Sequence, residues 1–182
     1  MIAIKTNLQG CYIIEPNVFK DNRGCFFESF NQKKFNKATG FNINFIQDNQ
    51  SRSSKGVLRG LHFQTGAHAQ SKLVRVVKGK VLDVCVDLRK ESLTFGKYFS
   101  LILDDVNCKQ LFIPKGFAHG FIALEEDTIF AYKCDNYYNK KSERGIIYND
   151  KDLNIDWQFP FKDLILSDKD KHLATFKEVV YG

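Results

Sequence analysis

The chain has 182 residues, of which 43% are hydrophobic and 26% are charged; this composition excludes wholesale disorder and fits one folded domain. Its 27 lysines and arginines outnumber its 21 acidic residues, which gives a net charge of +6 and indicates an anionic partner such as a phosphorylated metabolite. The basic residues are dispersed rather than gathered into a stripe, and this dispersal argues against nucleic acid as the partner.

The compartment is inferred from apolar runs and cysteines. No apolar run approaches the roughly 20 residues needed to span a bilayer, and residues 1–7 turn polar too soon for a secretory signal. The five cysteines are odd in number and contain no C-x-x-C pair, which disfavours both a disulfide framework and cysteine-ligated zinc. We therefore expect a cytoplasmic protein that binds neither a membrane nor nucleic acid.

Predicted helices are short and lie at the two ends of the chain. Residues 31–39, followed by Gly40, predict one helix, and residues 168–176, preceded by Ser167 as N-cap, predict another. Between them, apolar and polar residues alternate with the period of a strand. The predicted strands cover residues 73–77, 81–88, 98–103, 110–113 and 128–134. Many short strands with close turns predict an all-β domain over residues 1–182, with a jelly roll as the leading candidate and a short helix after about residue 167.

Several polar residues fall on these strands where a core residue would be ordinary. In residues 81–88 one face carries Leu82, Val84, Val86 and Leu88, while the other mixes acidic with apolar residues: Val81, Asp83, Cys85 and Asp87. Arg59 and His62 flank Gly60, and Gln64 shares a strand face with His62. Each of these residues alone is more often structural than functional. A closed β-fold would nevertheless allow them to converge on one cavity.

Two segments resemble the motifs of the cupin superfamily. Pro114-x-Gly116-x-x-His119 is similar to the second cupin motif, which implies a double-stranded β-helix jelly roll. The first cupin motif normally supplies His-x-His and a Glu as metal ligands, whereas this chain has His62-Phe63-Gln64. Because Gln64 replaces the second histidine and His68 lies in a polar loop, we expect no metal and no cofactor.

A longer series of motifs resembles one family within that superfamily. The motifs run in order from about Gly10 to Asp170: Phe19-x-Asp21-x-Arg23-Gly24-x-Phe26-x-Glu28, Gln47-Asp48-Asn49-x-Ser51, Arg59-Gly60-Leu61-His62-Phe63-Gln64, Gln70-x-Lys72-Leu73-Val74-Arg75, Tyr132-Lys133, Tyr138, Glu143 and Ser167-x-Lys169-Asp170. Together they resemble the dTDP-4-dehydrorhamnose 3,5-epimerase family. The resemblance implies an isomerase that needs no cofactor.

The resemblance also implies a substrate and a set of catalytic residues. The family inverts carbons 3 and 5 of a nucleotide-linked 4-keto-6-deoxyglucose to give dTDP-4-dehydro-L-rhamnose. A proton beside the ketone is acidic because the resulting carbanion spreads onto the keto oxygen, so the site needs a base, a donor at that oxygen and an acid. By resemblance His62 is the base, Asp170 its orienting carboxylate, Lys72 the cation near the keto oxygen, and Tyr132 the acid on the opposite face.

Binding residues follow from the same resemblance. It implies that Arg23 and Arg59 hold the diphosphate and that Tyr138 stacks on the thymine. The further substrate contacts that it implies are Glu28, Gln47, Asn49, His119, Glu143 and Lys169. In this family the N-terminal segment reaches the site of a partner subunit, so a homodimer is also expected.

Several alternatives stay open at this stage. Tyr137 competes with Tyr138 for the stacking position, and Asp83 competes with Asp170 as the partner of His62. The reaction itself has two alternatives on the same fold, a single-carbon epimerase or an epimerase of another nucleotide-linked 4-keto sugar. A non-catalytic cupin that binds a nucleotide or sugar is the alternative from a different class of protein.

Overall fold

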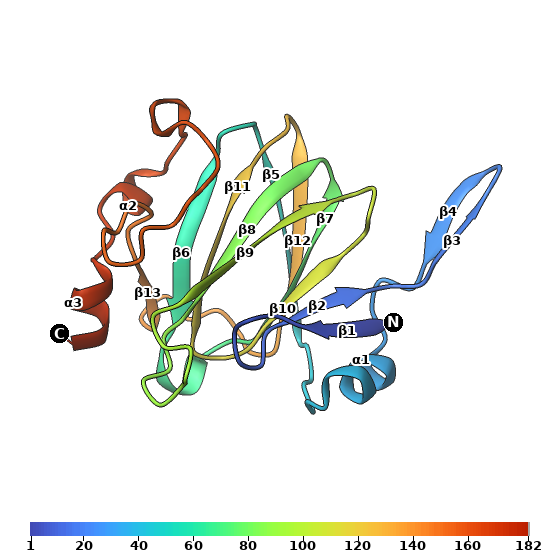
Figure 1. Cartoon of the computed structure of the whole chain (residues 1–182), viewed down its shortest axis with the longest axis horizontal. Coiled ribbons are helices and arrows are strands. Elements are labelled where there is room, and N and C mark those ends of the chain that lie inside the picture. The colour runs from blue at the N-terminus through green and yellow to red at the C-terminus, as the bar shows by residue number, and fades with distance from the viewer. Residues whose placement is uncertain (182) are drawn as a thin grey trace.

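Two antiparallel sheets packed face to face form the body of the protein in a computed structural model that describes residues 1–181 (Figure 1). The six-stranded sheet has the order β1 (Ile2–Lys5), β2 (Tyr12–Glu15), β10 (Gln110–Ile113), β7 (Lys72–Lys78), β12 (Thr128–Cys134) and β5 (Gln47–Ser53). The five-stranded sheet has the order β13 (Glu143–Gly145), β6 (Leu58–Gln64), β11 (Phe117–Ala123), β8 (Lys80–Asp87) and β9 (Tyr98–Asp104). The predicted all-β jelly roll is confirmed.

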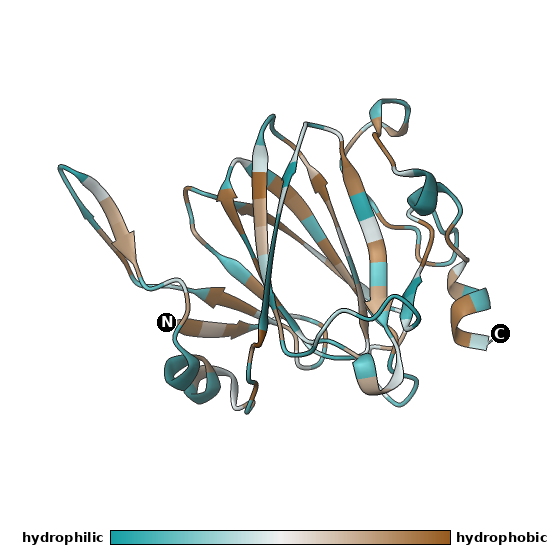
Figure 2. Cartoon of the chain, turned by 180° about the vertical axis from the view of Figure 1, so that it is seen from behind, coloured by the Kyte–Doolittle hydropathy of each residue, from teal (hydrophilic) through white to brown (hydrophobic). Residues whose placement is uncertain are grey.

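Alternation along the strands separates two cores. In β8, Leu82, Val84 and Val86 face outward from the sandwich, while Val81 and Cys85 belong to the core between the sheets. Figure 2 shows hydrophobic and hydrophilic residues following one another along the strands. Because both faces of β8 are covered, the strand is buried over almost its whole length, which explains why its sequence lacks a polar face.

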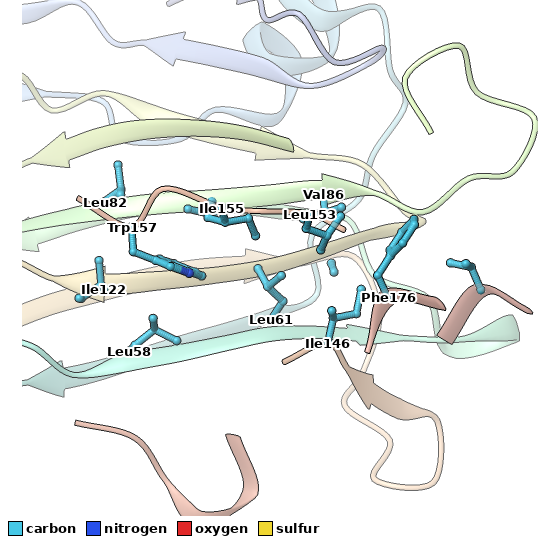
Figure 3. Close-up of a cluster of buried hydrophobic side chains, with 13 residues drawn as sticks. Leu58, Leu61, Leu82, Val86, Ile122, Ile146, Leu153, Ile155, Trp157 and Phe176 are labelled. Carbon is cyan, nitrogen blue, oxygen red and sulfur yellow. The ribbon is translucent and has the colours of Figure 1, made fainter. Parts of the chain in front are cut away.

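The outer face of the five-stranded sheet is covered by the C-terminal segment. Trp157, Ile155 and Leu153 pack against residues of β6, β8 and β11, as Figure 3 shows. Trp157 is 1% exposed, and its indole N–H donates a 2.8 Å hydrogen bond to the Tyr148 carbonyl. The segment that follows the last strand is therefore an integral layer of the domain.

The short helices lie outside the sandwich, and their ends follow capping rules. Helix α1 (Gln32–Thr39) confirms the first prediction, since the Asn31 side chain accepts from the Lys34 N–H and Gly40 ends the helix at a φ of 75°. The second predicted helix is wrong as one element. The chain instead forms two helices, α2 (Asp168–Lys171) and α3 (Phe176–Tyr181), with residues 172–175 between them. Two short 3-10 helices, η1 (Gly66–His68) and η2 (Phe161–Asp163), lie in loops.

The break between α2 and α3 has a tertiary cause. Ala174 forms an isolated bridge with Ile146, and the Ile147 N–H donates to the Ala174 carbonyl at 2.8 Å. The Phe176 N–H donates to the Asp150 carboxylate at 2.8 Å at the start of α3. These contacts hold the chain extended between the two helices, so local helical preference is overridden.

A hairpin of β3 (Val18–Asp21) and β4 (Gly24–Phe27) projects from the body (Figure 1). Its two strands pair only with each other among the described residues. Phe19 and Phe26 on this hairpin are 65% and 72% exposed. An isolated two-stranded hairpin is marginal in water, and this one also leaves two aromatic rings open to solvent.

Among residues 1–181, no helix is long and apolar enough to cross a membrane. All five cysteines are free, including Cys11 and Cys85, whose sulfur atoms lie 3.8 Å apart in the core between the sheets.

The buried indole makes a test of the C-terminal layer. Replacing Trp157 with Ala should lower the free energy of unfolding by about 3–5 kcal/mol, because it leaves a large cavity and an unpaired carbonyl. The measurement is equilibrium unfolding in urea. Leu93→Ala, at a side chain that is 90% exposed, is the control and should change stability by no more than about 0.5 kcal/mol. Equal stability of the two variants would contradict the packing of this layer.

Candidate active site

Two adjoining cavities of about 280 and 250 Å³ lie between the sheets, and His62, Lys72 and Tyr132 line both. Their walls come from opposite sheets, since His62 lies on β6 while Lys72 and Tyr132 lie on β7 and β12. The first cavity also touches Arg59, His119 and Asp170. The second also touches Asn49, Tyr138 and Glu143. The two cavities form one cleft with predicted site residues on both walls.

An irregularity in β6 brings Arg59 and His62 into the same cleft. Residues three apart in a regular strand point to opposite faces of the sheet. Here the pairing of β6 with β11 shifts register between the partners His119↔His62 and Phe121↔Arg59. Gly60 lies at this shift with a φ of 126°, and a Cβ there would sit 2.5 Å from Gly120 Cα. The glycine therefore allows a bulge that re-aims the guanidinium into the site.

His62 forms a hydrogen-bonded pair with Asp170 across 108 residues of sequence. Its Nε2 lies 2.6 Å from Oδ1 of the carboxylate. Ser167, the N-cap of α2, donates its hydroxyl to Oδ2 of Asp170 at 2.8 Å and accepts the Asp170 N–H at 3.1 Å. With a proton on Nε2 donated to the carboxylate, the ring leaves its Nδ1 lone pair for a ligand.

The surroundings of Asp170 favour its charged form. Burial raises the pKa of this carboxyl, but the hydrogen bond and charge of His62, together with the Ser167 hydroxyl, outweigh burial and lower it below the ordinary value of 3.8. A carboxylate that is 3% exposed is costly to bury unless it is paired. The pair therefore keeps a negative charge beside the imidazole, which stabilises the imidazolium once the ring takes up a proton.

A second histidine–carboxylate pair lies deeper in the cleft. His119 Nε2 lies 2.8 Å from Oδ2 of Asp83, and Asp83 is fully buried on β8. Within residues 1–181, no group hydrogen-bonds the other oxygen, Oδ1. Asp83 thus partners His119, and His62 partners Asp170.

Tyr132 and Lys72 supply the opposite wall. Burial raises the pKa of Tyr132, so the phenol keeps its proton near neutral pH. Burial lowers the pKa of Lys72, and the charges of Cys134, Asp83 and Glu143 raise it in part. The Lys72 ammonium lies 5.8 Å from the centre of the Tyr132 ring. No ion pair within residues 1–181 occupies this ammonium, which is thus available to an electron-rich oxygen of a ligand.

A third group of contacts lies at the mouth of the cleft. The Tyr138 hydroxyl donates to Glu143 at 3.1 Å, and Glu143 forms a 2.6 Å ion pair with Lys169. Burial raises the pKa of Glu143, but Lys169 outweighs it and leaves the carboxyl below its ordinary pKa. The Tyr138 N–H also donates to the Gln47 side chain at 3.0 Å. Tyr138 lines the second cavity, whereas Tyr137 does not.

Two predicted residues lie away from the cleft of their own chain. Arg23 and Glu28 belong to the projecting hairpin and the segment after it. Arg23 pairs with Asp21 at 2.6 Å with its side chain 85% exposed, and Glu28 pairs with Lys34 at 2.9 Å. The remaining predicted residues are brought together on the cleft walls: Gln47, Asn49, Arg59, His62, Lys72, His119, Tyr132, Tyr138, Glu143, Lys169 and Asp170.

Ser167 is a contact of the histidine–carboxylate pair that the sequence did not predict. Ser167 was identified as an N-cap and as part of the last motif, and its spacing of three from Asp170 was the available signal.

The residues present do not fit the metal site of other cupins. At the position of the second histidine, the Gln64 amide bonds backbone groups of the loops around it. His62 and His119 each face a carboxylate of their own. Within residues 1–181, no three His, Cys, Asp or Glu side chains are grouped to hold a metal ion. The donor set thus differs from that of a metal-binding cupin.

Comparison with known proteins gives one consistent result. The family model described as dTDP-4-dehydrorhamnose 3,5-epimerase matches residues 5–178. The enzyme of that name from Shigella flexneri is 51% identical over 181 residues, covering 100% of this chain and 99% of the relative.

Two crystal structures are similar over nearly the whole chain. That of dTDP-4-dehydrorhamnose 3,5-epimerase from Elizabethkingia anophelis NUHP1 has a TM-score of 0.95 and 55% identity, covering 98% of each chain. That of dTDP-6-deoxy-D-glucose-3,5-epimerase from Legionella pneumophila Philadelphia 1, in complex with dTDP-4-keto-L-rhamnose, has a TM-score of 0.91 and 47% identity. The aligned region covers 95% of this chain and 91% of the Legionella chain.

The His62–Asp170 pair is testable by carboxyl titration. His62→Ala should raise the pKa of Asp170, because it removes the strongest contribution that lowers this pKa while burial remains. The measurement is ¹³C NMR of labelled aspartate carboxyls against pH. The neighbouring Asp168, whose low pKa is due first to Lys171, is an internal control and should keep its midpoint. An unchanged Asp170 midpoint would contradict the pairing.

Proposed function

The chain belongs to the dTDP-4-dehydrorhamnose 3,5-epimerase family, and we propose that it inverts carbons 3 and 5 of dTDP-4-dehydro-6-deoxy-D-glucose to give dTDP-4-dehydro-L-rhamnose. The observation that supports this most is the pairing of a carboxylate-bound imidazole on one wall with a protonated phenol on the other. This arrangement suits inversion beside a ketone, because one group can remove a proton from one face of a carbon while the other returns a proton to the opposite face.

The base is His62. Carbons 3 and 5 both flank the ketone at carbon 4, so loss of a proton from either one gives an enolate with its charge on the keto oxygen. The imidazole takes the proton while the C–H electron pair moves into the enolate. Asp170 stabilises the imidazolium that results and keeps the ring in one orientation.

The acid is Tyr132. It donates its proton to the opposite face of the same carbon, the C–H bond re-forms and the ketone returns. The phenolate regains a proton from solvent and the imidazolium loses one, so each inversion exchanges one carbon-bound proton with water. The same pair can then act on the second carbon without any added reagent.

Lys72 stabilises the enolate. The keto oxygen gains negative charge as the proton leaves, and a buried ammonium interacts more strongly with that charge than with the neutral ketone. The buried Asp83 and the nearby Glu143 partly restore the pKa that burial lowers, which favours the charged form of Lys72.

The nucleotide occupies the mouth of the cleft in this proposal. Tyr138 stacks on the thymine, and Arg59, whose guanidinium has no acidic partner among the described residues, holds the diphosphate. Supporting contacts come from the remaining members of the predicted set: Gln47, Asn49, His119, Glu143 and Lys169. The comparison with a relative in complex with dTDP-4-keto-L-rhamnose supports this assignment of substrate class.

The active form in this proposal is a homodimer. Phe19 and Phe26 leave the hairpin with exposed apolar faces that need a cover, and Arg23 lies between the two strands of this hairpin, which projects from the body (Figure 1). Docking of the hairpin on a second copy would carry Arg23 and Glu28 to the partner's cleft, where Arg23 would meet the diphosphate.

The reaction is tested by incubating the protein with dTDP-4-keto-6-deoxyglucose in deuterium oxide, with proton NMR and mass spectrometry as readouts. Deuterium at carbons 3 and 5 is the expected result. Label at one carbon would replace the proposal with a single-carbon epimerase. No label from folded protein would overturn this substrate, and the same assay with GDP-linked keto sugars would then test another nucleotide. No label with any of them would support a non-catalytic binding protein.

The separate roles of His62 and Tyr132 can be tested in the same assay. Tyr132→Phe should lower the rate of inversion by about 100- to 10,000-fold, yet still incorporate deuterium with retained configuration, because the base is intact. His62→Ala should lose both inversion and exchange. Tyr12→Phe, at a tyrosine outside the cleft, is the matched control and should keep both. Full turnover by Tyr132→Phe would show that the acid is another group.

Complementation tests whether the hairpin serves the partner's cleft. Arg23→Ala and His62→Ala should each be nearly inactive alone. An equimolar mixture that has been unfolded and refolded should recover about a quarter of wild-type activity, because half of the dimers are mixed and each holds one intact site.

The matched control for complementation is a mixture of His62→Ala and Tyr132→Phe. Both lesions lie in the cleft of their own chain, so this mixture should stay inactive. Activity in neither mixture would contradict the exchange of hairpins.

A further inference from the structure

Gln64 remains without a role in the proposed reaction. It lies on β6 two residues after His62 and is 7% exposed. Its amide makes hydrogen bonds in three directions, to groups from two different loops. When both N–H donors of a buried amide bond backbone carbonyls, the amide fixes the positions of those carbonyls.

Two of the hydrogen bonds of Gln64 are made with the residues on either side of Tyr138. The amide nitrogen donates to the Tyr137 carbonyl at 3.2 Å, and the amide oxygen accepts the Asn139 N–H at 2.5 Å. The second hydrogen of the same nitrogen goes to the His68 carbonyl at 2.8 Å. Because both partners of the nitrogen are carbonyls and the partner of the oxygen is an N–H, only this orientation of the amide satisfies all three.

These bonds control an otherwise exposed ring. Tyr138 is 55% exposed, and among the described residues its side chain makes one hydrogen bond, which its hydroxyl donates to Glu143. The backbone on both sides of it is held by Gln64, and its own N–H by Gln47. A ring that stacks on a ligand must present its face at a set angle, and a ring this exposed depends for that angle on the backbone that carries it.

We propose that Gln64 is a positioning residue that pre-orients Tyr138 to stack on the nucleobase of the substrate. This inference rests on the proposed function, in which Tyr138 meets the base. It also gives a role to the glutamine that stands where other cupins have a metal-binding histidine. The Gln64 side chain bonds the backbone on both sides of Tyr138, at the end of the cleft where the nucleotide would bind. Gln64 has no donor left for the sugar, so its effect is on binding and not on the chemical step.

The test compares the binding of dTDP with the binding of inorganic pyrophosphate by calorimetry. Gln64→Met has a similar length but makes none of these hydrogen bonds. It should raise the Kd for dTDP about tenfold, which corresponds to part of the binding free energy of one base–aromatic stack. The Kd for pyrophosphate should not change. In turnover with the nucleotide sugar, KM should rise by a similar factor while kcat stays within about twofold.

A double-mutant cycle separates positioning from a general structural effect. In a Tyr138→Ala background, Gln64→Met should have no further effect on the Kd for dTDP, because the ring that it orients is gone. Gln32→Met is the matched control. Gln32 is a half-buried glutamine at the start of α1 whose amide donates to the Asn36 side chain at 2.8 Å, away from this loop, and its loss should leave both Kd values unchanged.

The outcomes distinguish this inference from the proposed function. If Tyr138→Ala weakens dTDP binding while Gln64→Met does not, the positioning role is wrong and the proposed function stands. If Tyr138→Ala itself leaves dTDP binding unchanged, the base contact in the proposed function is wrong, and this inference is lost with it. A fully additive loss in the double variant would also overturn positioning through Tyr138. Should Gln64→Met fold poorly, Gln64→Leu, which is also uncharged and loses all three hydrogen bonds, carries the same expectations.

Discussion

The hydrogen bond between His62 and Asp170 is the contact on which the proposed chemistry depends, and it joins two parts of the chain that fold for different reasons. His62 belongs to a strand between two others, while Asp170 belongs to a four-residue helix too short to be stable alone. The helix is held in place because the segment around it covers the outer face of the five-stranded sheet, with Trp157 and Phe176 buried in that layer. The packing of an apolar layer therefore sets the position of a carboxylate inside the cleft.

The two sheets contribute different functional groups to the site. The five-stranded sheet, covered on both faces, carries His62, His119 and Asp83, and α2, which contacts β6, carries Asp170. The six-stranded sheet carries the phenol and the ammonium, both with pKa values displaced by burial. Because the sheets face each other, a substrate between them meets an orienting carboxylate behind one wall and proton donors on the other. This opposition is a property of the sandwich rather than of any single loop.

Much of the fold could be predicted because strand alternation is a local signal. Residues 110–113 and 128–134 were predicted with their observed bounds. The residues of β8 were divided correctly between two faces, which the structure shows to be the outer and inner faces of the sandwich. The C-terminal helices were not, because the Ala174 bridge to Ile146 is a tertiary contact that local preference does not record. The projecting hairpin of β3 and β4 was also missed.

The site was predicted less completely, for a related reason. Alternation placed Asp83 on one strand face with Val81 and Cys85, but nothing local told which histidine it would contact, and only the fold pairs it with His119. The common facing of Arg59 and His62 depends on a bulge at Gly60 that simple alternation would deny. Gln64 was placed on the strand face of His62 and in the position of a metal-binding histidine, but none of its hydrogen bonds was predicted. Its three partners lie in loops distant in sequence, which no spacing rule reaches.

The two ends of the cleft are physically continuous through α2. Lys169 pairs with Glu143, which accepts the Tyr138 hydroxyl, and the next residue of the helix is Asp170. The ion pair with Glu143 at the mouth of the cleft and the carboxylate that contacts His62 thus come from adjacent residues of one short helix. Interactions remote from the reacting carbons can contribute to catalysis only if they position the reacting groups. A helix that carries a contact for each end meets that requirement, since a nucleotide bound against Tyr138 and Glu143 would rest on the same turn that orients His62.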